Sequence, residues 1–183
     1  MKTIVIYKSA SGFTQKLAER IADKLHAECM TISAAKPINL SDYDTIIYGG
    51  AVHAQRIIGL KKIKPRLLQL DKQQIAVFAV GSADSFSIPI IKKRNLSPSE
   101  QQRMEFFYFR GGYNKNALSW SSRIIMAIVS TIVFKNMQKK KPEFVEILEM
   151  MKNGGDFTQT EDITPLLNYA SKGDPHAPRS CHA

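Results

Sequence analysis

Cysteine and long hydrophobic runs are scarce in this chain of 183 residues. Its two cysteines, Cys29 and Cys181, lie far apart and give neither a disulfide framework nor the paired spacing of a zinc site. We therefore expect a reducing compartment and no metal site. The longest uncharged apolar-rich stretch, residues 124–134, is about half as long as the roughly 20 residues that a membrane-spanning helix needs.

The start of the chain has little apolar sequence before the first polar segment. The apolar run covers only residues 4–7, whereas a signal peptide carries about 7 to 15 apolar residues. We expect the mature protein to begin here and to be cytoplasmic, with the inner face of the membrane as an alternative location.

Acidic residues are also in short supply: 16 Asp and Glu face 26 Lys and Arg, for a formal charge of +10. Hydrophobic residues make up 44% of the chain, which is too many for a disordered protein and enough for one globular core. The excess of positive charge favours anionic partners.

Short apolar runs alternate with helical patterns along the chain. We expect strands at residues 3–7, 28–32, 45–48, 75–80 and 106–109. Apolar residues at helical spacing predict helices at 17–25, 57–70, 118–135, 144–151 and 163–170, with a break or a kink near residue 64 caused by Pro65. A further helix is predicted at 98–104, because Ser97 is an N-cap residue followed by Pro98, with Glu100 three residues later. This alternation predicts one α/β domain over residues 1–172, with a parallel sheet covered on both faces, and a flexible tail over 173–183.

Three predicted loops follow apolar strands: Ser9–Thr14, Gly49–His53 and Gly81–Ser85. Open α/β sheets bind ligands at the carboxyl ends of their strands, so we expect these loops to converge on one crevice. The first loop places the hydroxyls of Ser9, Ser11 and Thr14 at the start of a helix, where free backbone amides attract phosphate. The patterns of triphosphate and dinucleotide loops are missing, which favours a compact monophosphate.

The segment Ser9-Ala10-Ser11-Gly12-Phe13-Thr14 after an N-terminal strand resembles the phosphate loop of flavodoxins, which bind flavin mononucleotide (FMN). The resemblance covers roughly residues 1–172. It implies a flavodoxin-like three-layer sandwich with a five-stranded parallel sheet in the order 2-1-3-4-5. The cofactor-binding residues that it implies are Ser9, Ala10, Ser11, Gly12, Phe13, Thr14, Gly49, Gly50, Ala51, Val52, His53, Gly81, Ser82 and Ala83.

The resemblance implies electron transfer through a noncovalent flavin, with a redox partner protein or a quinone as partner. It also implies that Gly49 or Gly50 permits a peptide rearrangement when the flavin is reduced. No side chain is identified as catalytic. Within the family, the Gly111-Gly112-Tyr113 turn and the apolar helix expected after it resemble the menaquinone-dependent protoporphyrinogen oxidases, so a membrane-associated, quinone-linked enzyme is one alternative. A cofactor-less or regulatory module is a second.

The positive charge gathers in three segments without carboxylates: residues 56–66, 92–94 and 106–142. We expect them to make the mouth of the crevice electropositive and to attract an acidic redox protein, an anionic membrane surface or a carboxylate-bearing substrate. Nucleic acid is not an expected partner because no recognition motif accompanies the charge. The apolar stripe at 118–133 fits either a helix packed on the sheet or a membrane-surface contact.

Overall fold

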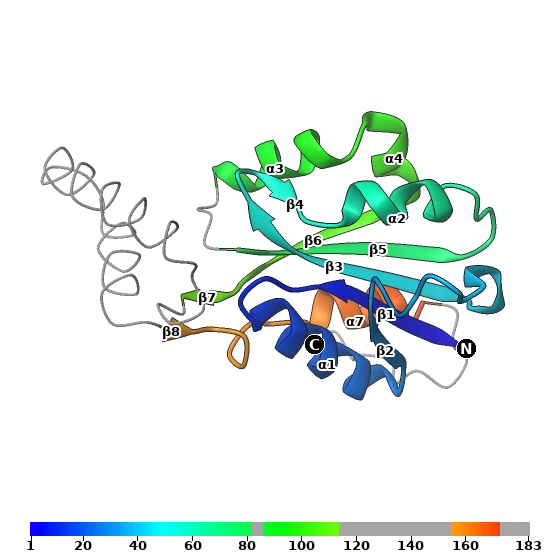
Figure 1. Cartoon of the computed structure of the whole chain (residues 1–183), viewed down its shortest axis with the longest axis horizontal. Coiled ribbons are helices and arrows are strands. Elements are labelled where there is room, and N and C mark those ends of the chain that lie inside the picture. The colour runs from blue at the N-terminus through cyan, green and yellow to red at the C-terminus, as the bar shows by residue number, and fades with distance from the viewer. Residues whose placement is uncertain (82–85, 114–154, 173–183) are drawn as a thin grey trace, which may run out of the picture.

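The computed structural model describes residues 1–81, 86–113 and 155–172, which form a three-layer α/β structure around one sheet (Figure 1). Its parallel strands are β1 (Thr3–Lys8), β2 (Glu28–Thr31), β3 (Thr45–His53), β5 (Gln74–Gly81) and β6 (Glu105–Arg110). They lie in the order β2-β1-β3-β5-β6, which is the predicted order 2-1-3-4-5 when these five strands are counted along the chain. The predicted fold class is therefore confirmed.

Helices cover both faces of the sheet (Figure 1). On one face lie α1 (Phe13–Leu25) and α7 (Thr164–Ala170), and on the other lie α2 (Leu60–Leu67), α3 (Ser87–Asn95) and α4 (Pro98–Arg103). Successive strand side chains point to opposite faces, so an unbroken apolar run fills both cores. In β1, for example, Ile4 and Ile6 belong to the α2 side and Val5 to the α1 side, and all three are fully buried.

The predicted helix at residues 57–70 is too long, and of the break or kink expected near residue 64 the break is wrong, because the helix is continuous there. Helix α2 runs through Pro65 to Leu67. Proline removes one backbone donor from the helix, but Leu60, Ile63 and Leu67 are buried on its inner side. This burial holds the last turn in place despite the missing hydrogen bond. At its start, Ile57 belongs to the short strand β4 (Arg56–Ile57), which pairs with β3 in an antiparallel hairpin.

Two further elements were not predicted. Helix α3 has little amphipathic pattern and buries only Ile91 fully, so periodicity gives no signal for it. The two-residue strands β7 (Gly112–Tyr113) and β8 (Gly155–Asp156) form a small antiparallel ribbon. By contrast, α4 starts as predicted, with Ser97 as N-cap and Glu100 completing a capping box.

The final helix α7 matches its predicted stripe, since Ile163, Leu166 and Ala170 are buried under the sheet. The predicted helices at 118–135 and 144–151 and the tail at 173–183 lie outside the described residues. None of the helices in the described ranges combines the length and the apolar character needed to cross a bilayer.

Candidate functional site

The segments that carry the predicted ligand loops meet at one edge of the sheet. Lys8 at the end of β1 lies opposite Gly50 in β3, and Ala51 lies opposite Val80 in β5. A Cβ atom added to Gly81 would stand 3.2 Å from the Cβ of Val52, so the second and third segments touch. Of the third predicted loop, Gly81 is placed here, whereas Ser82 and Ala83 lie outside the described residues.

The phosphate loop, residues 9–14, links β1 to α1 and is closed by an internal hydrogen bond. The amide of Gly12 donates to Ser9 Oγ at 3.0 Å. Gly12 is the N-cap of α1 with φ of 93°, a left-handed conformation that strains any residue with a side chain. No side chain caps the helix and no acidic residue lies in its first turn. The amides at the start of α1 are therefore available to an anion.

Thr14 carries the clearest sign of a missing ligand within this loop. The residue is 1% exposed, and its Oγ1 has no hydrogen-bond partner among the described residues. A buried hydroxyl without a partner costs about 1 to 3 kcal/mol, so such groups are normally paired. A phosphate oxygen at the helix start would accept this hydrogen bond. The buried Thr14 hydroxyl and the uncapped start of α1 therefore fit the phosphate of FMN.

The predicted loop at Gly49–His53 is wrong as secondary structure, because these residues form the end of β3. Gly49 is paired with Tyr7 on one side and Phe78 on the other, so its backbone is held within the sheet. The expected peptide rearrangement at Gly49 or Gly50 has no free loop in which to occur.

Both glycines are explained by close packing instead. A Cβ on Gly49 would lie 2.0 Å from Phe78 Cζ, and one on Gly50 would lie 2.4 Å from Ile57 Cγ2. A side chain at Gly49 would displace the ring of Phe78, and one at Gly50 would displace the hairpin segment at Ile57 and Ile58. Ala51 and Val52 follow, half-buried, and His53 is exposed at the tip of the strand.

Sequence reasoning missed the hairpin that covers this edge and the residues that hold it. Asn95 at the end of α3 accepts from the amide of Ile57 at 2.9 Å and donates to the carbonyl of Gln55 at 2.8 Å. Tyr48 donates from its hydroxyl to the carbonyl of Ile58 at 2.7 Å. Burial raises the pKa of Tyr48, which keeps it a donor. No sequence motif marks Asn95, because its role depends on a contact between distant segments.

Not all of the basic residues predicted around the crevice face it. Lys64 forms an ion pair with Glu100 at 3.0 Å, and Arg66 donates to the carbonyls of Ala35 and Ile38. Near the phosphate loop, Lys16 pairs with Asp156 of β8 at 2.5 Å. These cations serve partly to join elements, so the positive charge around the edge is smaller than a count along the sequence suggests.

The sheet has an uncapped helix start at its carboxyl edge, with a buried hydroxyl that has no partner among the described residues. These features define an α/β domain built to hold a phosphorylated ligand. Residues 4–143 match the model of the flavodoxin domain family, and the chain belongs to this family. Membership in the family supports the predicted function, an FMN-binding redox protein.

Several solved structures are similar to this chain at low identity. A flavodoxin from the domain Archaea is 18% identical, with 64% of this chain and 89% of that chain covered and a TM-score of 0.43. Flavodoxin 2 from Bacillus cereus is 18% identical, with coverage of 70% and 96% and a TM-score of 0.45. A flavoprotein in complex with FMN from Lactobacillus acidophilus is 19% identical, with coverage of 60% and 92% and a TM-score of 0.42. No curated protein sequence matches the chain.

Proposed function

We propose that this protein holds one FMN noncovalently and acts as a redox protein through it. The observation that carries the proposal is the buried Thr14 hydroxyl, which lacks a partner among the described residues at the uncapped start of α1. Family membership supports the same ligand. When bound, FMN supplies the capacity to accept and pass on electrons, and the chain orients it and sets its potential.

In this proposal the phosphate loop holds the phosphate through the hydroxyls of Ser9, Ser11 and Thr14 and the uncapped amides of the first turn of α1, which begins at Phe13. Ser9 Oγ already accepts a hydrogen bond from Gly12, so it offers its own proton to the ligand. The end of β3, from Gly50 to Val52, lies beside the ring, with its backbone already paired to the neighbouring strands. Gly81 lines the pyrimidine side, and the contribution predicted for Ser82 and Ala83 lies outside the described residues.

The test of the site is FMN titration of the purified protein, followed by its visible spectrum and flavin fluorescence. Ser11→Asp places a negative charge where the phosphate lies, so we expect the FMN dissociation constant to rise about a hundredfold. Ser99→Asp on α4 is the matched control, since it adds the same charge at an exposed position. Protein that stays colourless throughout the FMN titration would overturn the proposed function. Equal FMN affinity in the two variants would overturn the assignment of residues 9–14 as the phosphate site.

A second candidate is a quinone-linked, protoporphyrinogen oxidase-like enzyme that binds a membrane surface. The segment from Phe106 to Pro142 favours it, because it contains seven basic residues and no carboxylate. It begins within β6, whose carboxyl end at Arg110 lies at the ligand edge of the sheet. Oxidation of protoporphyrinogen with a quinone, together with binding to anionic liposomes, would support this enzyme. Electron exchange with a reductase without either property would support a carrier.

A further inference from the structure

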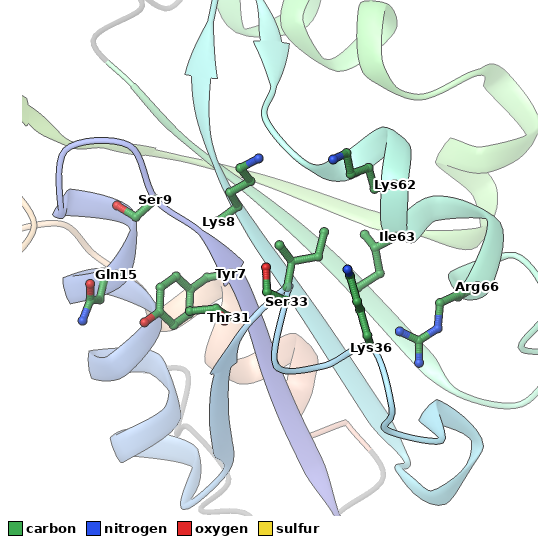
Figure 2. A pocket seen from close by; sticks show the side chains of 11 residues that line it. Tyr7, Lys8, Ser9, Gln15, Thr31, Ser33, Lys36, Lys62, Ile63 and Arg66 are labelled. Carbon is green, nitrogen blue, oxygen red and sulfur yellow. The ribbon is translucent and has the colours of Figure 1, made fainter. Parts of the chain in front are cut away.

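A cavity of about 380 Å³ lies beside the phosphate loop, over the ends of β1 and β2 and against α2 (Figure 2). We define this cavity as the basic pocket, because four cations line it: Lys8, Lys36, Lys62 and Arg66. No Asp or Glu is among its lining residues in the described part of the chain. Its volume falls within the usual range for small-molecule sites.

Three of these cations have no counter-ion of their own. Lys8, Lys36 and Lys62 make no ion pair with any carboxylate in the ranges that the structure describes. Figure 2 shows Lys8 and Lys62 extending toward one another, with Lys36 reaching the same space from the loop after β2. Like charges brought together repel, and an anion between them removes this cost.

Hydrogen bonds and packing between neighbouring segments fix the walls of the basic pocket. Arg66 donates to the carbonyls of Ala35 and Ile38, which fastens the loop after β2 to α2. The amide of Ala35 donates to the carbonyl of Thr31 at 3.0 Å, and Ala35 is fully buried. Lys36 therefore projects from an ordered turn. The Lys8 stem packs where α2 begins, since a Cβ on Gly59 would lie 3.0 Å from its Cδ.

The remaining lining defines the chemistry of the occupant. Thr31 and Ser33 bring hydroxyls that can donate to oxyanions, and Ile32 and Ile63 supply an apolar wall. We propose that the basic pocket binds a small organic anion that carries two or more phosphate or carboxylate groups. Because the cations surround a hollow instead of lining a flat face, a small molecule fits better than an anionic macromolecule.

The basic pocket borders the proposed flavin site but is separate from it. Ser9 is the only residue of the phosphate loop among its lining residues, and neither Gly12 nor Thr14 lines it. The occupant is thus a second ligand, and its binding does not depend on FMN.

Calorimetric titration with pyrophosphate and, in a second arm, citrate tests this proposal on the full chain with and without added FMN. We expect saturable binding of at least one probe, and the preferred probe identifies phosphate or carboxylate as the anionic group. In Lys36→Gln/Lys62→Gln this binding should weaken at least about tenfold, because two charge-assisted contacts are lost. Lys61→Gln/Lys72→Gln is the control, since it removes the same charge at exposed positions outside the pocket.

Unchanged FMN affinity in the Lys36/Lys62 variant would support a separate pocket, whereas competition between the probes and FMN would overturn it. Equal weakening in the two variants would also overturn the proposal, because it would show only a net-charge effect. So would binding of phosphatidylglycerol vesicles without saturable binding of either probe. Failure of FMN to bind would count against the proposed function and leave this measurement intact.

Discussion

At the residue scale, Thr14 links the stability of the domain to its ligand. A buried hydroxyl is normally satisfied, and an unsatisfied one lowers stability by about 1 to 3 kcal/mol. In the free protein the Thr14 hydroxyl has no partner within the described residues. The group therefore costs stability without FMN and contributes binding energy with it.

Thr14→Val should separate these two effects. Valine has nearly the shape of threonine, so we expect the FMN-free protein to gain about 1 kcal/mol of unfolding free energy as the unpaired hydroxyl is removed. The same variant should bind FMN about tenfold or more weakly, because it loses a hydrogen bond to a charged group. Denaturant unfolding and FMN titration measure the two effects.

Thr3→Val is the control for this variant, since Thr3 is buried at the opposite end of β1. It should leave FMN affinity unchanged. A Thr14 variant that loses stability and keeps its affinity would show that the hydroxyl serves the fold and not the ligand.

At the element scale, the hairpin of β3 and β4 is built on a strained turn. Ala54 and Gln55 have φ values of 47° and 64°, the left-handed conformation that two-residue hairpin turns require. Such turns usually contain glycine or asparagine, and neither is present here. The hairpin persists because Asn95 and Tyr48 hold it from outside, through hydrogen bonds to Gln55, Ile57 and Ile58.

Ala54→Gly should relieve part of this strain. A left-handed residue with a side chain costs roughly 1 to 2 kcal/mol, and the greater freedom of glycine in the unfolded chain offsets part of the gain. We expect the free energy of unfolding to rise by up to about 1 kcal/mol, measured by denaturant titration. Ala34→Gly is the control, since Ala34 is exposed and its φ is not positive. That variant should lower stability, and a loss in both variants would contradict the strain argument.

Also at this scale, the ion pair between Lys64 and Glu100 joins α2 to the start of α4. Burial alone would raise the pKa of Glu100, but hydrogen bonds from Ser97 and Lys64 lower it below its usual value of 4.5. A carboxyl group with a lowered pKa stabilises the folded state above its unfolded pKa. That contribution is lost as the pH falls through the lowered folded value.

Lys64→Met should therefore flatten the acid side of the stability profile. We expect the variant to be less stable than the parent near neutral pH and the difference to shrink below about pH 4, as Glu100 becomes protonated. The midpoints of urea unfolding for the variant and the parent, taken from about pH 7 to below about pH 4, measure this difference in stability. Lys61→Met, at an exposed position on the same helix, should track the parent. A constant difference at all pH values would point to lost packing of the lysine stem.

At the scale of the whole molecule, one edge of the sheet holds both proposed sites. The phosphate loop and the end of β3 form the flavin site, and the ends of β1 and β2 with α2 form the basic pocket. Parallel strands end at the same edge, so loops far apart in the sequence are brought together there. A second ligand could in this way reach the neighbourhood of the flavin without sharing its contacts.

The sequence alone predicted the five strands of the parallel sheet and the phosphate loop, and the order of the strands followed from the resemblance to flavodoxins. Strands buried on both faces have to be apolar throughout, and a helix that starts beside a phosphate needs small and hydroxyl-bearing residues. These requirements are local, so the residue types at positions 4–7 and 9–14 are enough to predict the first strand and the phosphate loop. The capping box of Ser97 and Glu100 was predictable for the same reason.

Only the tertiary structure decided the rest. Helix α2 continues through Pro65 because burial of Ile63 and Leu67 outweighs a local preference, and β3 extends to His53 because a hairpin folds back on it. Gly50 is needed for the approach of Ile57, and Lys8, Lys36 and Lys62 form a pocket only after three separate segments meet. Contacts between segments distant in the chain leave no periodic or local pattern in the sequence, so only the assembled fold contains them.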